Sequence, residues 1–169
     1  MIGFNIGVIS LIGRVVGANV MARTNEVISA GFKIGICYSA TLALIYITFR
    51  FPLVEVFAPP SGDFSEIREL SAFMMIGLSS YAMADAIISV SGGVLRGAGD
   101  TRWLMYASVI LHWAMLVSQY FIILVWEYGP RISWLAFCVL IFAIAVVYVW
   151  RLRSGIWRDP ERLRLVMVE

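Results

Sequence analysis

Four stretches of this sequence are long, apolar and almost free of charged side chains. They are residues 32–51, 70–95, 103–126 and 132–150. An α-helix needs about 20 mainly apolar residues to cross the hydrocarbon core of a bilayer. Tryptophans lie near the ends of these stretches, where aromatic side chains anchor a helix at the membrane interface. The sequence therefore predicts an all-α, polytopic transmembrane helix bundle.

The composition excludes most soluble classes of protein. Apolar residues make up 61% of the 169 residues and charged residues 14%, against about 25% charged residues in an average globular chain. A soluble domain of this length has too much surface to hide so many apolar side chains. The net charge of +2 is small and spread along the chain, so we expect no nucleic-acid partner. Membrane lipid is the expected surrounding.

The first apolar segment is shorter than the other four. It runs for thirteen residues, Met1–Gly13, before Arg14, and a helix of that length spans roughly 20 Å, less than a core of about 30 Å. No basic residue precedes it, which disfavours a signal peptide. We predict a helix at about residues 1–20 and interpret it as the remainder of a crossing helix whose beginning is missing.

Basic residues orient the predicted bundle. Ten of the 13 lysine and arginine residues lie in the first loop, the third loop and the C-terminal tail, and three lie on the opposite side. Because basic residues favour the cytoplasmic side, these two loops and the tail are expected in the cytoplasm. The predicted organisation is a transmembrane part over residues 1–150 and a basic cytoplasmic tail over residues 151–169.

Asp85 is the acidic residue inside the third apolar stretch, near its middle. A carboxylate there costs several kcal/mol unless it is protonated, paired or bound to a cation. On a helix, Tyr81, Ser89 and Gly92 share the face of Asp85 and offer hydroxyl oxygens and room for a neighbouring helix. We interpret Asp85 as a proton or cation site. A carboxyl group hydrogen-bonded for packing is the alternative.

The fourth stretch carries one polar stripe at helical spacing. Its members are Ser108, His112, Met115 and Gln119. His112 and Gln119, together with Tyr81 and Ser89, are candidates for the lining of a polar cavity. The alternative is that the stripe packs against a neighbouring helix through interhelical hydrogen bonds.

Glycines recur at a spacing of four residues, which predicts close helix packing. The pairs are Gly3/Gly7, Gly13/Gly17, Gly31/Gly35 and Gly93/Gly97. Gly97 and Gly99 are also expected to end the third helix, and Asp100 to pair with Arg96 or Arg102 or to cap the next helix. In the loop before the third helix, Asp63 and Glu66 have the spacing of a capping box.

Enzyme and metal-site readings find little support. The string Gly97-Ala98-Gly99-Asp100 matches the GxGD sequence of intramembrane aspartyl proteases. Its nearest possible partner, Asp85, lies about 22 Å away along the same helix, so the two carboxyl groups cannot share a proton. A catalytic dyad of Ser91 and His112 is also disfavoured, because the two residues are expected at different depths in the membrane. One histidine and two cysteines cannot form a structural zinc site.

Three segments together resemble the multidrug and toxic compound extrusion (MATE) transporters. Residues 93–102, GVLRGAGDTR, resemble the GxLRGxGDT signature of that family through Gly93, Leu95, Arg96, Gly97, Gly99, Asp100 and Thr101. Residues 13–19, with Gly13 and Gly17, resemble the glycine-containing stretch that closes the second helix of each MATE lobe. Residues 151–157, RLRSGIW, resemble the segment after the last helix.

The resemblance implies part of the C-terminal six-helix lobe of a NorM-type exporter of organic cations or drugs, located in the cell (inner) membrane. The position of Asp85, eleven residues before Arg96, matches an acidic residue of the family's cation site, which implies Na⁺ or H⁺ as coupling ion and no other cofactor. The N-terminal lobe would come from the same or a separate polypeptide. The alternative from another class is a non-transporting remnant that associates with other membrane helices.

Overall fold

The computed structural model describes residues 2–59 and 63–159. Within these ranges the chain is all-α and has no strand, which confirms the predicted fold class. The α-helices are α1 (Ile2–Gly17), α2 (Thr24–Thr48), α3 (Arg50–Glu55), α4 (Ser65–Gly97), α5 (Thr101–Tyr120) and α6 (Pro130–Ser154). Two 3₁₀ turns, η1 (Met21–Arg23) and η3 (Ile156–Arg158), and a π-helical turn, η2 (Phe121–Val125), extend them.

Four helical segments are long and apolar enough to cross a membrane. They are Met21–Thr48, Ser65–Gly97, Thr101–Val125 and Pro130–Ser154. The helix α1 is apolar but shorter. Large apolar side chains on α5 are exposed, among them Ile110 and Trp113, as expected for a helix surrounded by lipid. The described part of the chain thus holds four candidate spans and one short apolar helix.

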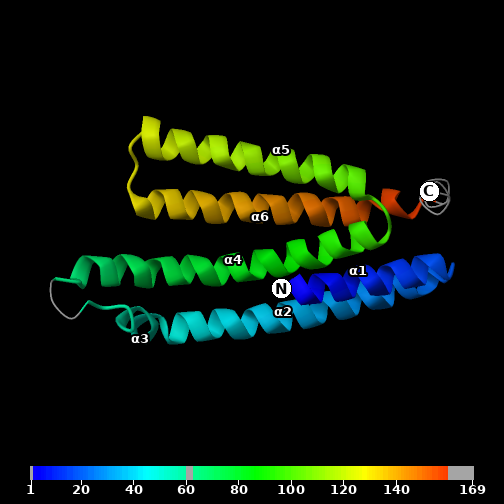
Figure 1. The fold of residues 1–169 in the computed structure, drawn as a ribbon, viewed down its shortest axis with the longest axis horizontal. Helices are drawn as coiled ribbons and strands as arrows, with labels where there is room; N and C mark the ends of the chain where they lie inside the picture. The colour runs from blue at the N-terminus through cyan, green and yellow to red at the C-terminus, as the bar shows by residue number, and fades with distance from the viewer. Residues whose placement is uncertain (1, 60–62, 160–169) are drawn as a thin grey trace.

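The long helix α4 lies at the centre of the bundle, between α1 and α2 on one side and α6 on the other (Figure 1). Near the start of α1, Asn5 contacts Ser89 of α4, and further along α1, Ile12 lies against Gly97, which comes later in α4. These two helices therefore run in the same direction. α6 lies between α4 and α5 (Figure 1).

Glycines permit the closest helix contacts, as the spacing predicts for two pairs. A Cβ atom added at Gly97 would lie 2.7 Å from the backbone oxygen of Ile9, and one at Gly93 would lie 3.0 Å from Val8. Gly31 and Gly35 of α2 each approach Val90 in the same way. For Gly3, Gly7 and Gly17 the prediction is wrong, because nothing lies within 4 Å of an added Cβ. A Cβ added at Gly13 would lie 3.6 Å from the backbone oxygen of Gly97, so Gly13 does face α4 in ordinary contact.

Helices extend beyond the apolar stretches that predict them. α2 begins at Thr24 rather than residue 32, because its polar first turn holds Glu26, whose charge favours a helix N-terminus. α4 covers 65–97 rather than 70–95. α3 has no counterpart in the prediction, and its Pro52 occupies the first turn, where the missing N–H costs little. Hydropathy detects the lipid-facing part of a helix and misses the part in the interface.

The last helix also differs from the prediction in a way that matters for the site. α6 continues to Ser154, so Arg151 belongs to its final turn and not to a tail. Gly155 follows with a φ of 71° and ends the helix in the left-handed conformation that glycine adopts readily. Residues 160–169 of the predicted tail lie outside the described residues.

The loop before α4 is held by two polar contacts. Asp63 Oδ1 accepts hydrogen bonds from the backbone N–H of Ser65 at 3.0 Å and from its hydroxyl at 2.7 Å. The predicted capping box of Asp63 and Glu66 is wrong, because the residue that caps α4 is Phe64 and Asp63 bonds to Ser65 instead of the N–H of Glu66. Arg68 on α4 pairs with Glu55 on α3 at 2.6 Å. These contacts fix the end of the bundle that holds α3.

Candidate functional site

Asp85 lies inside α4, and its side chain is half-buried. Within residues 2–59 and 63–159, its carboxyl group makes no hydrogen bond or ion pair. The packing alternative for Asp85 requires a hydrogen-bond partner, and no described side chain supplies one. A membrane-embedded carboxyl group in this situation is neutral through a proton or balanced by a cation.

The face of α4 around Asp85 holds the candidate residues Tyr81 and Ser89 and also contacts a residue that the sequence does not single out. Tyr81 is half-buried, and its ring stacks on Phe137 of α6 at 6.0 Å between centroids. The backbone oxygen of Ser89 accepts a hydrogen bond from the Asn5 side chain at 2.5 Å. Asn5 Oδ1 in turn accepts from Arg96 at 3.2 Å. A polar strip thus runs along α4 from Tyr81 through Asp85 to Arg96.

Asn5 is the residue of this strip that the sequence analysis missed. Its signal is a lone amide side chain in the apolar run Met1–Gly13. The contacts of Asn5 with Ser89 and of Val8 with Gly93 place the first residues of α1 at the level of Asp85. Asp85 therefore lies at the level of the first described residues of α1.

The polar stripe of α5 lies apart from Asp85, because α6 lies between α4 and α5 (Figure 1). His112 is exposed, and its Nδ1 lies 2.7 Å from the backbone oxygen of Ser108 in the same helix. Gln119 donates a hydrogen bond to the backbone oxygen of Ser133 in the first turn of α6 at 3.2 Å. The structure does not bring these two residues together with Tyr81 and Ser89, and the contact of Gln119 is the interhelical bond of the packing alternative.

Metal and catalytic clusters do not form among the described residues. No three histidine, cysteine, aspartate or glutamate side chains of residues 2–59 and 63–159 gather closely enough to hold a metal ion. Ser91 is fully buried in α4, and its hydroxyl has no partner there, whereas His112 is exposed on α5. The Ser91–His112 dyad is therefore not assembled.

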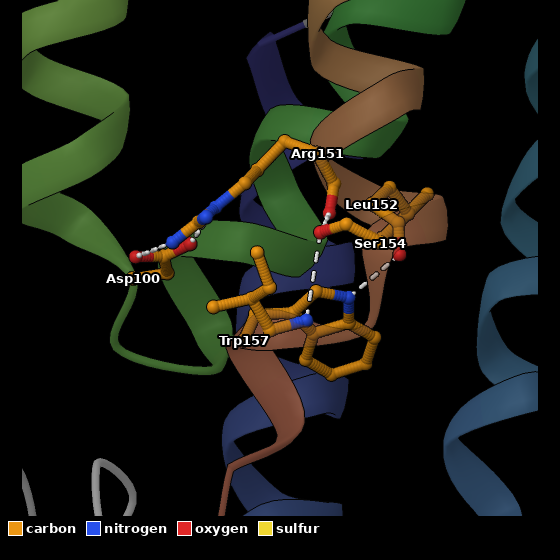
Figure 2. A network of polar contacts seen from close by, with 6 residues as sticks. Asp100, Arg151, Leu152, Ser154 and Trp157 are labelled. Carbon is orange, nitrogen blue, oxygen red and sulfur yellow. Dashed lines mark hydrogen bonds and ion pairs between the residues drawn. The ribbon is translucent and has the colours of Figure 1, made fainter.

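The signature around Asp100 and the segment after α6 meet at the end of the bundle that holds the turn between α4 and α5. We call this the α4–α5 end. Asp100 pairs with Arg151 through Oδ2 and Nε at 2.8 Å, and Oδ1 accepts a second bond from Nη2 at 3.2 Å (Figure 2). The predicted pairing of Asp100 with Arg96 or Arg102 is wrong, and so is its capping of α5. The reason is that the last turn of α6 carries a buried arginine to the carboxylate.

One tryptophan ring packs on this ion pair, and a second tryptophan is buried just after the end of α6. The Arg151 guanidinium lies 5.1 Å from the centre of the Trp103 ring. Trp157, which is 2% exposed, donates from Nε1 to the backbone oxygen of Leu152 at 2.8 Å (Figure 2). Both charged side chains of the pair are less than a tenth exposed. The clasp of Asp100, Arg151 and Trp103 thus joins the turn after α4 to α5 and α6.

Comparison with protein families adds a match over most of the chain. The family model MatE matches residues 1–121, which include the polar strip around Asp85 and the signature at residues 93–102. The chain belongs to the MatE family. No solved structure matches it.

Membership of the MatE family settles the broad class of activity. The family consists of efflux transporters, which in general are not enzymes. Together with the four apolar spans, this makes the chain a multi-pass membrane protein. The segment of Arg151 and Trp157 lies beyond the matched residues, and the structure links it to the MatE signature through Asp100.

Proposed function

We propose that this MatE chain acts as part of the C-terminal lobe of a transporter that exports organic cations or drugs in exchange for Na⁺ or H⁺, with Asp85 as the coupling carboxylate. The observation that carries the proposal is the half-buried Asp85 inside a membrane-spanning helix, without a hydrogen bond or ion pair among the described residues. Ionisable groups in this situation are expensive and generally serve ion or proton pathways.

The chemistry follows from the two states of the carboxylate. When Asp85 carries a proton or a bound Na⁺, its carboxyl group has no net negative charge and does not attract a cationic substrate. When Asp85 is charged and free, it attracts such a substrate. Exchange of the ion for the substrate on opposite sides of the membrane then couples an ion gradient to export. Tyr81 and Ser89 are the oxygen-bearing neighbours that we assign to the same strip.

The proposal also includes a partner lobe, an orientation in the membrane and a moving helix. An N-terminal lobe, on the same or a separate polypeptide, would complete the transport path. The chain would reside in the cell membrane with its α4–α5 end and C-terminus in the cytoplasm, because ten of its 13 basic residues lie in loops and a tail on that side. In the transport cycle, α4 would be the helix that changes position as Asp85 gains and loses its ion.

A dye-efflux assay tests the proposal. Cells that lack other drug exporters would express the chain with a MatE N-terminal lobe, and export of a cationic dye would be measured with and without external sodium. We expect Asp85→Asn to abolish gradient-driven efflux while the protein still inserts in the membrane. Asp63→Asn is the matched control, since it removes a carboxylate from the loop before α4 and is expected to leave efflux unchanged.

Two outcomes would contradict the proposal. Undiminished efflux by Asp85→Asn would remove Asp85 from the coupling mechanism. An absence of dye export by the parent protein in either gradient, with normal insertion, would favour the alternative of a helix-association protein that does not transport.

A further inference from the structure

A groove opens between α2 and α6 at the α4–α5 end of the bundle, away from the strip around Asp85. Its volume is about 520 Å³, within the range of roughly 300–1,000 Å³ common for ligand sites. Its walls are formed by Asn25, Ile28, Phe32, Ile36, Ile87, Val149, Leu152, Arg153, Gly155 and Arg158. Neither the transport proposal nor the family match assigns it a role.

The groove is polar at one end and apolar along the rest of its length. Asn25, Arg153 and Arg158 line its mouth at the end of the bundle. On α2 the lining continues from Asn25 to Ile36, which at 1.5 Å per residue covers about 16 Å. One leaflet of a bilayer has about 15 Å of hydrocarbon, half of a core of about 30 Å. The groove therefore has the polarity and length of a single phospholipid chain with its headgroup.

The two arginines at the mouth retain free hydrogen-bonding capacity. Arg158 donates from Nη2 to Asn25 Oδ1 at 2.5 Å, and its guanidinium lies 4.6 Å from the centre of the Trp157 ring. Its Nε atom is buried and has no partner in the described part of the chain. Arg153 is exposed and makes no ion pair with any described residue. None of the residues lining the groove is acidic.

We propose that this groove binds an anionic phospholipid of the adjacent leaflet. The phosphate oxygens would accept hydrogen bonds from the Arg153 and Arg158 guanidinium groups, which match phosphate geometry well. One acyl chain would lie between α2 and α6, along Phe32 and Val149. Basic pockets between membrane helices on the cytoplasmic side favour anionic headgroups, and the groove has no carboxylate to pair with the amine of a zwitterionic lipid.

Native mass spectrometry of the full purified chain in detergent tests the site. The protein would be titrated with phosphatidylglycerol and, separately, with phosphatidylcholine. We expect one preferentially bound phosphatidylglycerol. The double variant Arg153→Gln/Arg158→Gln is expected to bind phosphatidylglycerol about 30-fold more weakly, because it loses two arginine contacts with the phosphate group. Phosphatidylcholine binding would change little.

A charge-matched control separates the groove from general electrostatics. Arg14→Gln/Arg102→Gln removes two exposed arginines from the same end of the bundle, outside the groove. This variant is expected to bind phosphatidylglycerol as the parent does. An equal loss of affinity in both double variants would overturn the proposal.

The apolar part of the site distinguishes a lipid from a free anion. Val149→Trp fills the groove and leaves both arginines in place. We expect Val149→Trp to weaken phosphatidylglycerol binding about tenfold, because the larger side chain would exclude about two methylene groups of the acyl chain from the groove. Unchanged binding by Val149→Trp, or displacement of the lipid by inorganic phosphate at similar concentration, would show an anion site without a lipid chain and would overturn the proposal.

Discussion

At the scale of single residues, the ion pair of Asp100 and Arg151 is the clearest case of an interaction that burial makes critical. Both side chains are less than a tenth exposed, and their contact is 2.8 Å long. Removing one member leaves the other charge without compensation, which typically costs about 3–5 kcal/mol. The arginine's position over the Trp103 ring adds packing that its loss would also remove.

We expect Arg151→Ala to lower the stability of the chain by about 3–5 kcal/mol, measured as the shift of its denaturation midpoint in detergent. Arg102→Ala is the informative control, because Arg102 neighbours Asp100 in sequence but is exposed, and its loss should change stability by less than about 0.5 kcal/mol. Since the double variant Asp100→Ala/Arg151→Ala leaves no uncompensated charge, it should be less harmed than Arg151→Ala alone. Equal effects of Arg102→Ala and Arg151→Ala would contradict the assignment of the clasp.

At the scale of helices, the contact of α4 with α1 depends on the absence of a side chain at Gly97. A Cβ there would lie 2.7 Å from a backbone oxygen of α1, which cannot move without shifting the helix. We predict that Gly97→Ala destabilises the bundle by about 1–3 kcal/mol through overpacking, as measured by thermal unfolding in detergent.

Gly7→Ala is the matched control for Gly97→Ala, because Gly7 lies in the facing helix α1 and has nothing within 4 Å of an added Cβ. Alanine there should be neutral or slightly stabilising, since it restricts the unfolded chain. A Gly97→Ala protein as stable as Gly7→Ala would mean that α1 and α4 do not approach as described.

The loop at the start of α4 carries a pH-dependent contact. Hydrogen bonds from the Ser65 N–H and then from its hydroxyl hold the pKa of Asp63 below its ordinary value of 3.8. Because the folded-state pKa is the lower one, the contact stabilises this end of α4 above pH 3.8, and its contribution is lost as the pH falls through the folded pKa.

A carboxyl ¹³C titration of Asp63 measures this directly. We expect a pKa below 3.8 in the parent protein and a partial return toward 3.8 in Ser65→Ala, which keeps the N–H donor and loses the hydroxyl. A parent pKa at or above 3.8 would show that Asp63 does not hold the start of α4.

Sequence patterns predict the helices of this chain better than their ends or their partners. Apolar runs locate the four candidate membrane spans among the described residues, because hydropathy reflects transfer into lipid. They place the start of α2 at residue 32 instead of Thr24, since the first turns of that helix are polar. The partner of Asp100 could not be predicted, because Arg151 is distant in sequence and is brought near only by the packing of α6 on α4.

The same limit applies to the candidate site. Asp85 is evident from the sequence, because a carboxylate inside an apolar run has few ordinary explanations. The sequence does not reveal Asn5, since its contact with Ser89 depends on α1 and α4 running side by side. Polarity alone groups His112 and Gln119 with Tyr81 and Ser89, and only the packing order of α4, α6 and α5 separates them (Figure 1).

At the scale of the whole molecule, the proposed orientation in the membrane rests on the distribution of arginine and lysine. In a variant without native cysteines (Cys37→Ser/Cys138→Ser), a cysteine at Tyr128, between η2 and α6, should react with a membrane-impermeant maleimide in intact cells. A cysteine at Ala22, between α1 and α2, should react only after permeabilisation. The reverse pattern of labelling would place the α4–α5 end outside the cell and contradict the proposed topology.

The central claim is that Asp85 couples ion movement to substrate movement. The most direct measurement is the flux of Na⁺ or H⁺ that a cationic substrate induces in vesicles containing the chain together with its N-terminal lobe. With the parent protein, addition of substrate on one side should drive one of these ions in the opposite direction. Asp85→Asn should show no substrate-induced ion flux at an equal amount of inserted protein, whereas an undiminished flux in that variant would contradict the account.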